Sequence, residues 1–161
     1  MSPVRPDLVA CWLFRLDARG RPEILLIRRA AGRIYPGLWQ CVTGRIEPDE
    51  RILAGALREV FEETGLRGAD LEAVFETDIV NWFHEETADV IWSEAVFAAR
   101  VSPEATVTLS DEHDDVRWVT LEAARELVIW PAYVRAIEVV AWLVEHPEKA
   151  ETLRLLVDST A

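Results

Sequence analysis

Three glutamates and one arginine are spaced so that a single helix could present all of them on one face. Successive residues of an α-helix rotate by about 100°, which groups Arg58, Glu59, Glu62 and Glu63 and turns Val60 and Leu57 to the opposite side. Hard divalent cations such as Mg²⁺ prefer carboxylate oxygens as ligands. The spacing therefore indicates either a cation site or an acidic face that is simply solvated.

The solvated alternative has a physical weakness. Glu59 and Glu63 are like charges four residues apart, and such pairs repel each other on a helix. Both lie late in the helix with Glu62, where the macrodipole disfavours anions. Gly55 falls on the same face at a cost of about 1 kcal/mol in helix propensity, and it leaves room for a metal ion, a water or a phosphate. A cation bound here would turn the repulsion into attraction.

A second acidic cluster, Asp-Glu-His-Asp-Asp, occupies residues 111–115 and contains Glu112. It lacks the spacing and the glycine of an EF-hand calcium loop. From the residues alone, this cluster is either a solvated acidic loop or a source of one further carboxylate ligand.

The elements that must position these side chains follow from periodicity and turn signals. Apolar stretches predict strands at 8–16, 23–28, 39–43, 71–83, 90–101 and 116–119. Helical spacing predicts helices at 51–64, 121–128 and 131–145. Asp49 is the expected N-cap of the first helix, and Gly65 is its expected C-terminal glycine. The order of these elements predicts one mixed α/β domain: strands come first, a helix is inserted, more strands follow, and helices end the chain.

The helix expected at 131–145 is apolar on nearly all sides. Such a helix is buried either in the core of its own chain or against a partner. The sequence leaves both alternatives open, and the second would make the protein a homodimer.

The composition limits the class of partner. The 161 residues carry 17 Lys and Arg against 29 Asp and Glu, a formal net charge of −12, which excludes the basic field that captures nucleic acid. The segment 11–45 is an exception because seven arginines suited to phosphate contacts outnumber its two acidic residues.

The two cysteines, Cys11 and Cys41, are too few for a disulfide framework. With neither a signal-peptide pattern nor a membrane-length apolar stretch, we expect a cytoplasmic protein without membrane contact.

The spacing from Gly44 to Leu66 is specific. It reads Gly44, five residues, Glu50, seven residues, Arg58-Glu59-Val60, one residue, Glu62-Glu63, one residue, Gly65-Leu66. This resembles the signature of the Nudix hydrolase family at every position. The resemblance implies an α/β/α sandwich with a mixed sheet flanked by helices. It also implies a single domain over residues 1–161, with a core at about 8–145 and a C-terminal tail at 146–161.

The resemblance implies a reaction and a role for each residue. Nudix enzymes hydrolyse a phosphoanhydride of a nucleoside diphosphate linked to another group, using divalent cations. Here the cofactor would be Mg²⁺, with Mn²⁺ as a substitute. By position, Glu59 and Glu63 would be the main metal ligands, Glu62 would assist them, and Arg58 would orient the carboxylates. Glu50 would support the loop and the helix. Gly44 would let the backbone approach the site, with the Thr43 carbonyl as a further ligand.

A second stretch is similar to one branch of that family, the dihydroneopterin triphosphate or dATP pyrophosphohydrolases. It is Trp39-Gln-Cys-Val-Thr-Gly44, followed later by Glu112-His113 and Val116-Arg-Trp118. By this similarity Glu112 would be a further metal ligand or the base, Arg28 would bind substrate, and Trp39 would either stack on the base or belong to the core. The loop 30–37 is longer than in that branch.

The resemblance implies a small-molecule partner, a nucleoside or pterin triphosphate. Two other substrates, ADP-ribose and a dinucleoside polyphosphate, are the alternatives, and a non-catalytic nucleotide sensor is the third. The intact set of Arg58, Glu59, Glu62 and Glu63 argues against the sensor, because a binder would not need all four.

Overall fold

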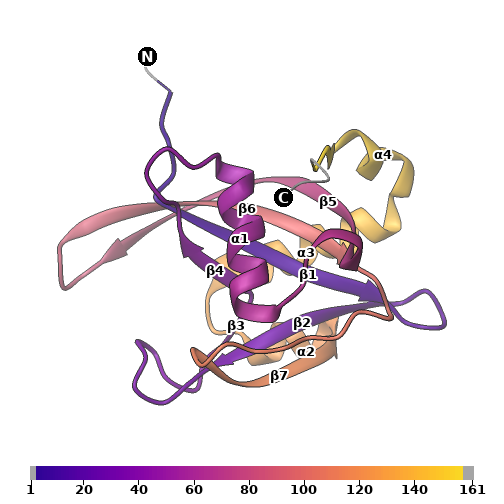
Figure 1. Cartoon of the computed structure of the whole chain (residues 1–161), viewed down its shortest axis with the longest axis horizontal. Helices are drawn as coiled ribbons and strands as arrows, with labels where there is room; N and C mark the ends of the chain where they lie inside the picture. Colours follow the sequence, from indigo (N-terminus) through magenta and orange to yellow (C-terminus); the bar gives the residue numbers. More distant parts are fainter. Residues whose placement is uncertain (1–2, 158–161) are drawn as a thin grey trace.

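The computed structural model describes residues 3–157. Figure 1 shows a mixed sheet with helices on both of its faces. The strands are β1 Leu8–Leu16, β2 Pro22–Arg29, β3 Trp39–Gln40, β4 Val42–Arg45, β5 Leu71–Glu85, β6 Val90–Val101, β7 His113–Thr120 and β8 Arg154–Leu155. The helices are α1 Ile52–Thr64, a short 3-10 helix Gly68–Asp70, α2 Leu121–Leu127, α3 Pro131–Glu145 and α4 Pro147–Thr152.

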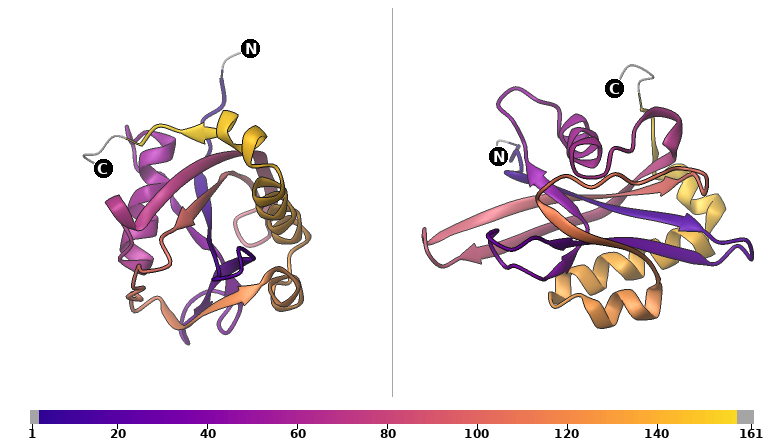
Figure 2. Two further views of the ribbon diagram at one scale, coloured as in Figure 1. Left: turned by 90° about the vertical axis from the view of Figure 1, so that its right-hand side faces the viewer. Right: turned by 60° about the horizontal axis from the view of Figure 1, so that its bottom comes forward.

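The sheet confirms the expected fold class. Its strand order is β3-β2-β1-β6-β5-β8, with β4 paired to β1 and β7 paired to β2. The pair β1–β6 is parallel and the other pairs are antiparallel. Figure 2 shows α1 on one side of the sheet and α2 and α3 on the other. The architecture is therefore an α/β/α sandwich.

Strand β1 lies at the centre of the sandwich and is buried on both faces, which is why its sequence is apolar without alternation. Val9, Cys11 and Leu13 pack in the hydrophobic cluster on the α1 side. Trp12 and Phe14, on the other face of the strand, pack in the cluster on the α3 side.

Strands β1 and β2 pair only next to the turn that joins them, over Phe14–Leu16 of β1, and separate away from that turn. In the separated part, β4 pairs with the start of β1, from Leu8 to Cys11, and β3 pairs with the end of β2. Because β4 packs directly against α1, this fork places Thr43 and Gly44 beside the helix that carries the glutamates.

Helix α1 ends as expected and begins differently. Gly65 adopts the left-handed conformation at φ 73°, and its N–H donates to the Phe61 carbonyl. The expected N-cap, Asp49, was wrong: it lies outside the helix at φ 65°, and the N-cap residue is Arg51, without a side-chain capping bond. The turn before α1 is held instead by the Glu50 carboxylate, which accepts the Glu47 N–H at 3.0 Å.

Helix α3 packs into the core of its own chain. Ile137, Val140 and Leu143 are buried in the cluster that also contains Trp12. Of the two alternatives for this helix, the structure therefore supports the core. The segment expected as a tail continues into α4, whose Ala150 joins the same cluster, and into β8, which pairs with β5. No described helix is long and apolar enough to cross a membrane.

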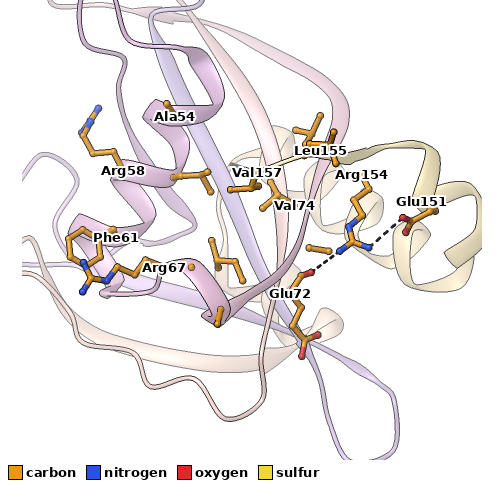
Figure 3. A pocket seen from close by; sticks show the side chains of 16 residues that line it. Ala54, Arg58, Phe61, Arg67, Glu72, Val74, Glu151, Arg154, Leu155 and Val157 are labelled. Carbon is orange, nitrogen blue, oxygen red and sulfur yellow. Dashed lines mark hydrogen bonds and ion pairs between the residues drawn. The ribbon is translucent and has the colours of Figure 1, made fainter. Parts of the chain in front are cut away.

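A cavity of about 1000 Å³ lies between α1, β5 and residues 154–157. Figure 3 shows Phe61 and Arg67 at one end and Arg154 at the other, where Arg154 contacts the Glu72 carbonyl and Glu151. Arg58 contributes to its lining, but Glu59, Glu62 and Glu63 do not. This cavity therefore lies on a different flank of α1 from the glutamates.

Candidate active site

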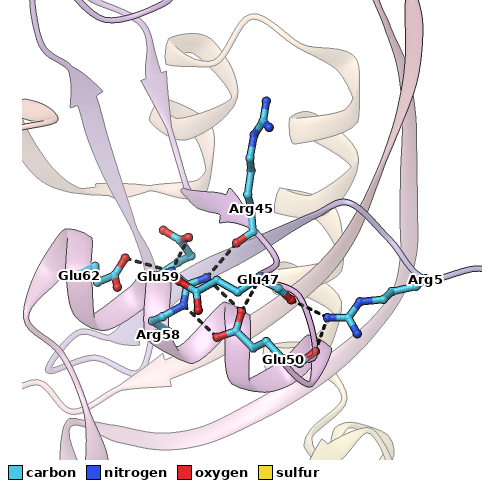
Figure 4. A network of polar contacts seen from close by, with 7 residues as sticks. All are labelled: Arg5, Arg45, Glu47, Glu50, Arg58, Glu59 and Glu62. Atoms are coloured by element: carbon cyan, nitrogen blue, oxygen red, sulfur yellow. Dashed lines mark hydrogen bonds and ion pairs between the residues drawn. The ribbon is translucent and has the colours of Figure 1, made fainter.

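Arg58 is the centre of a polar network that fixes the carboxylates of α1 (Figure 4). Its Nε and Nη2 donate to the two oxygens of Glu50 at 2.9 and 3.1 Å, and Nη2 also donates to the Arg45 carbonyl at 2.8 Å. Its Nη1 donates to Glu59 at 2.8 Å and to Glu62 at 3.0 Å. The hydrogen bonds from Arg58 and from the Glu47 backbone lower the pKa of Glu50. Glu50 thus anchors Arg58, which in turn holds Glu59 and Glu62.

Two glycines make space for this network. A Cβ at Gly44 would lie 1.9 Å from Cδ of Glu59, so any side chain there would collide with that carboxylate. A Cβ at Gly55 would lie 2.9 Å from a carboxylate oxygen of Glu50. The expectation that Gly55 leaves room for a metal, water or phosphate was therefore wrong, because Glu50 folds back over the helix and fills that space.

Glu63 is the most deeply placed carboxylate, with 6% of its surface exposed. Its Oε2 is buried and has no hydrogen-bond partner within residues 3–157. Burial, together with the charges of Glu59 and Glu112, raises the pKa of Glu63 to about 9, although a hydrogen bond from the Thr43 backbone acts in the opposite direction. Burial also raises the pKa of Glu59. An unpartnered carboxylate oxygen among like charges is the arrangement that a hard cation would satisfy.

Glu112 lies immediately before β7, close enough to α1 for its charge to raise the pKa of both Glu59 and Glu63. Its carboxylate is half-exposed and lies 3.5 Å from a guanidinium nitrogen of Arg33. Among the described residues, no three His, Cys, Asp or Glu side chains are already arranged to hold a metal ion. Arg58 holds Glu59 and Glu62 on one nitrogen, whereas Glu112 is paired with Arg33, and the metal ligand set stays a prediction.

The loop 30–37 connects the acidic segment to the helical layer. Arg33 contacts Asp111 at 3.6 Å as well as Glu112, and the Ala30 N–H donates to the Glu112 carbonyl at 2.9 Å. At the other end of the loop, the ring of Tyr35 meets the edge of Trp130 at 5.7 Å between centroids. The loop thus spans from a predicted catalytic carboxylate to the start of α3.

Arg28 does not contact the α1 carboxylates. Its Nε donates to Asp114 at 2.6 Å, and its guanidinium lies 5.7 Å from the ring of Trp39. Trp39 is 8% exposed and packs in the cluster on the α3 side, with a second guanidinium, that of Arg117, at 4.6 Å. Of the two alternatives for Trp39, the structure supports the core residue.

Arg29, which was not among the site residues predicted from the sequence, is the arginine of β2 whose charge acts on Glu63. Its charge lowers the pKa of Glu63, and its side chain donates to the Ile34 carbonyl and, at 3.4 Å, to Gln40. The pairing of β2 with β7 shifts register between Arg28 and Arg29. Such an irregularity re-aims a side chain. Two adjacent arginines at the end of a strand were the only signal in the sequence, and they do not reveal the shift.

Residues 5–143 match the family described as NUDIX domain. The nucleoside triphosphatase NudI of Klebsiella pneumoniae is 33% identical over 130 residues, which cover 74% of this chain and 85% of that protein. An octanoyltransferase of Myxococcus xanthus is 38% identical over 111 residues, which cover 67% of this chain but only 30% of that protein.

Solved structures share the fold at lower identity. The Ap4A hydrolase of C. elegans, in a binary complex, superposes with a TM-score of 0.74 at 21% identity and covers 88% of this chain and 98% of that one. The dihydroneopterin triphosphate pyrophosphohydrolase of E. coli superposes with a TM-score of 0.70 at 23% identity and covers 85% of this chain and 97% of that one.

Proposed function

Since this chain belongs to the NUDIX family and is a Nudix hydrolase, we propose that it is a pyrophosphohydrolase of nucleoside triphosphate-like substrates. The substrate would be a dNTP such as dATP, or dihydroneopterin triphosphate, and the products would be a monophosphate and pyrophosphate. One observation carries the proposal: a buried oxygen of Glu63, near Glu59 and Glu112, has no hydrogen-bond partner among residues 3–157. The name of the NudI relative, a nucleoside triphosphatase, supports the choice of substrate class.

The proposed cofactor is a divalent cation, Mg²⁺ with Mn²⁺ as a substitute. Glu59, Glu62, Glu63 and Glu112 would hold it, since carboxylate oxygens are the ligands that such ions prefer. When bound, the cation neutralises phosphate charge and activates a water for in-line attack. The Thr43 carbonyl, at the strand that packs on α1, is the further ligand proposed from the resemblance.

The chain's own residues have separate tasks in this scheme. Arg58 keeps Glu59 and Glu62 in place through hydrogen bonds of 2.8 and 3.0 Å, and Gly44 gives the Glu59 carboxylate its space. Glu62, which is exposed, or Glu112, which lies beyond α1, would accept the proton of the attacking water.

Arginines beside the carboxylates would bind the phosphates. Arg29 is placed best for this, because its charge acts on Glu63, while Arg33 reaches Glu112. Arg28 would join them only after releasing Asp114. Guanidinium groups suit phosphate oxygens because their planar fork donates two parallel hydrogen bonds. This local cluster would let a chain of net charge −12 bind a small polyphosphate while rejecting nucleic acid.

The test is a substrate panel with product identification. Purified protein with Mg²⁺, with Mn²⁺ or with chelator would be offered dNTPs, dihydroneopterin triphosphate, ADP-ribose and diadenosine polyphosphates. Pyrophosphate release from a triphosphate supports the proposal. AMP and ribose phosphate from ADP-ribose, or cleavage of a dinucleoside polyphosphate in preference, would move the substrate assignment to that class. Binding of nucleotides with no hydrolysis of any of them would identify a sensor.

A matched pair of variants tests the site itself. Glu63→Gln keeps the shape of the side chain but removes the charge, so hydrolysis should be lost while the circular dichroism spectrum is retained. Glu148→Gln, at an exposed position in α4, makes the same chemical change and should leave turnover unaltered. Turnover by the Glu63→Gln variant comparable to that of Glu148→Gln would contradict the site assignment.

A further inference from the structure

The hairpin of β5 and β6 extends past the rest of the sandwich as an arm. Figures 1 and 2 show it projecting beyond the helices. We define the arm as residues 79–91. Trp82 is 60% exposed, and four more large apolar side chains of the arm are exposed on its two faces: Val80, Phe83, Val90 and Ile91. Exposed apolar groups gathered in this way mark an interaction surface more often than single ones do.

The outer edge of the arm is also open. Strand β8 pairs with β5 only at Val74 and Phe75, and the Glu76 N–H donates to the Leu153 carbonyl. Within the described residues, no strand pairs with the outer edge of residues 79–85. This stretch contains neither lysine nor proline, two of the residue types that protect edge strands from pairing with another chain, and the bulge between Glu76 and Ile79 lies before it rather than within it. An open edge of this kind is a template for an added strand.

We propose that the added strand is residues 79–85 of a second copy of this chain, paired antiparallel about a two-fold axis at Trp82. A two-fold axis requires the same patch on both copies. Centred on Trp82, the register sets Trp82 opposite its own copy and Val80 opposite His84. Aromatic cross-strand pairs favour such a ladder. Because the pairing uses the open edge, the internal hydrogen bonds of β5 with β6 are unchanged.

The exposed area sets the strength of this dimer. Val80, Trp82 and Phe83 together expose roughly 300 Å² of side chain, given that an aromatic side chain presents about 150–250 Å². A standard interface buries about 800 Å² per partner. Even with the strand backbone added, the contact is smaller than this standard size, so the dimer should be weak and should form only toward the upper end of a concentration series that reaches about 500 µM. Each copy carries a net charge of −12, so added salt should strengthen association by screening the repulsion.

Sedimentation velocity from about 1 µM to about 500 µM, at low and high salt, tests the proposal. The wild-type protein should shift from monomer to dimer, at lower concentration when salt is high. Trp82→Lys should remain a monomer throughout. Leu156→Lys makes a matched change at a residue that is 95% exposed and outside the arm, and it should dimerise like the wild type. A wild-type monomer at every concentration, or equal dimerisation of both variants, would overturn the proposal.

Cysteine cross-linking tests the register while keeping Trp82. The double variant Val80→Cys/His84→Cys should form a disulfide-linked dimer on oxidation, because each new thiol would face the other type across the axis. Neither single variant should form a disulfide-linked dimer, because its thiol would face a native side chain of the other copy. The native Cys11 and Cys41 are buried and give no background. Efficient cross-linking of a single variant, or none by the double, would refute this register.

Discussion

Gly44→Ala is the sharpest test of how the fold positions Glu59. The added Cβ would lie 1.9 Å from Cδ of Glu59 and 2.1 and 2.3 Å from its oxygens, whereas non-bonded atoms pack at about 3.5 Å. The carboxylate must therefore move by more than about 1 Å and leave its 2.8 Å hydrogen bond with Arg58. The atoms that the methyl group meets are the free end of one side chain, which can rotate away, so the loss of folding free energy should stay below the roughly 1–3 kcal/mol that overpacking of a core costs.

The effect on catalysis should exceed the effect on stability. A displacement of about 1 Å in a positioned group can reduce the rate about 100-fold. We expect kcat/KM of Gly44→Ala to fall by at least that factor, measured by pyrophosphate release on the best substrate of the panel. Urea unfolding monitored by tryptophan fluorescence would measure the stability loss separately.

Two further variants separate the steric effect from other causes. Gly55→Ala faces only the flexible end of Glu50 at 2.9 Å and gains about 1 kcal/mol of helix propensity, so it should keep most of its activity. In Gly44→Ala/Glu59→Asp the shorter acid makes room for the methyl group, so stability should recover while activity stays low. If Gly44→Ala retained wild-type kcat/KM, the close packing of Glu59 on β4 would not matter for function.

Three other predictions concern Arg58, the two cysteines and Glu94. Arg58→Lys keeps the charge but not the two-pronged contact with Glu50 at 2.9 and 3.1 Å, so kcat/KM should fall at least about tenfold; an unchanged value would show that charge alone suffices. Burial raises the pKa of Cys11 to about 12 and that of Cys41 well above its usual value, so Ellman's reagent should label neither thiol until urea unfolds the protein. Burial raises the pKa of Glu94, so the ionisation of this carboxyl opposes folding as the pH rises above about 4.5. Glu94→Gln should therefore raise Tm more at pH 8 than at pH 4. An equal gain in Tm at both pH values would show that the buried charge is not the cause.

Much of the site could be predicted because its geometry is local. Arg58, Glu59, Glu62 and Glu63 share a face through helix geometry alone, and Gly65 ends the helix for a reason internal to one turn. The apolar sequence of β1 likewise indicated a strand, and the structure shows that this strand is buried on both faces. Asp49 was wrong as the N-cap because the turn before α1 is arranged around the next residue, Glu50, whose carboxylate accepts hydrogen bonds from Arg58. Capping rules consider only neighbouring residues and do not include this contact.

The sequence by itself determined the family and the helix face that carries the carboxylates, because both depend on spacing along one short segment. It also determined the fold class, because the order of strands and helices can be recognised from local periodicity. Only the tertiary structure decided which groups from other elements meet that face. It filled the space over Gly55 with Glu50 and paired Arg28 with Asp114, so that in β2 it is the charge of Arg29 that acts on Glu63. It also placed α3 in the core and left the arm exposed. These outcomes depend on strand register, a local shift in pairing and the packing of residues far apart in the chain, and helical or strand periodicity contains no information about such contacts.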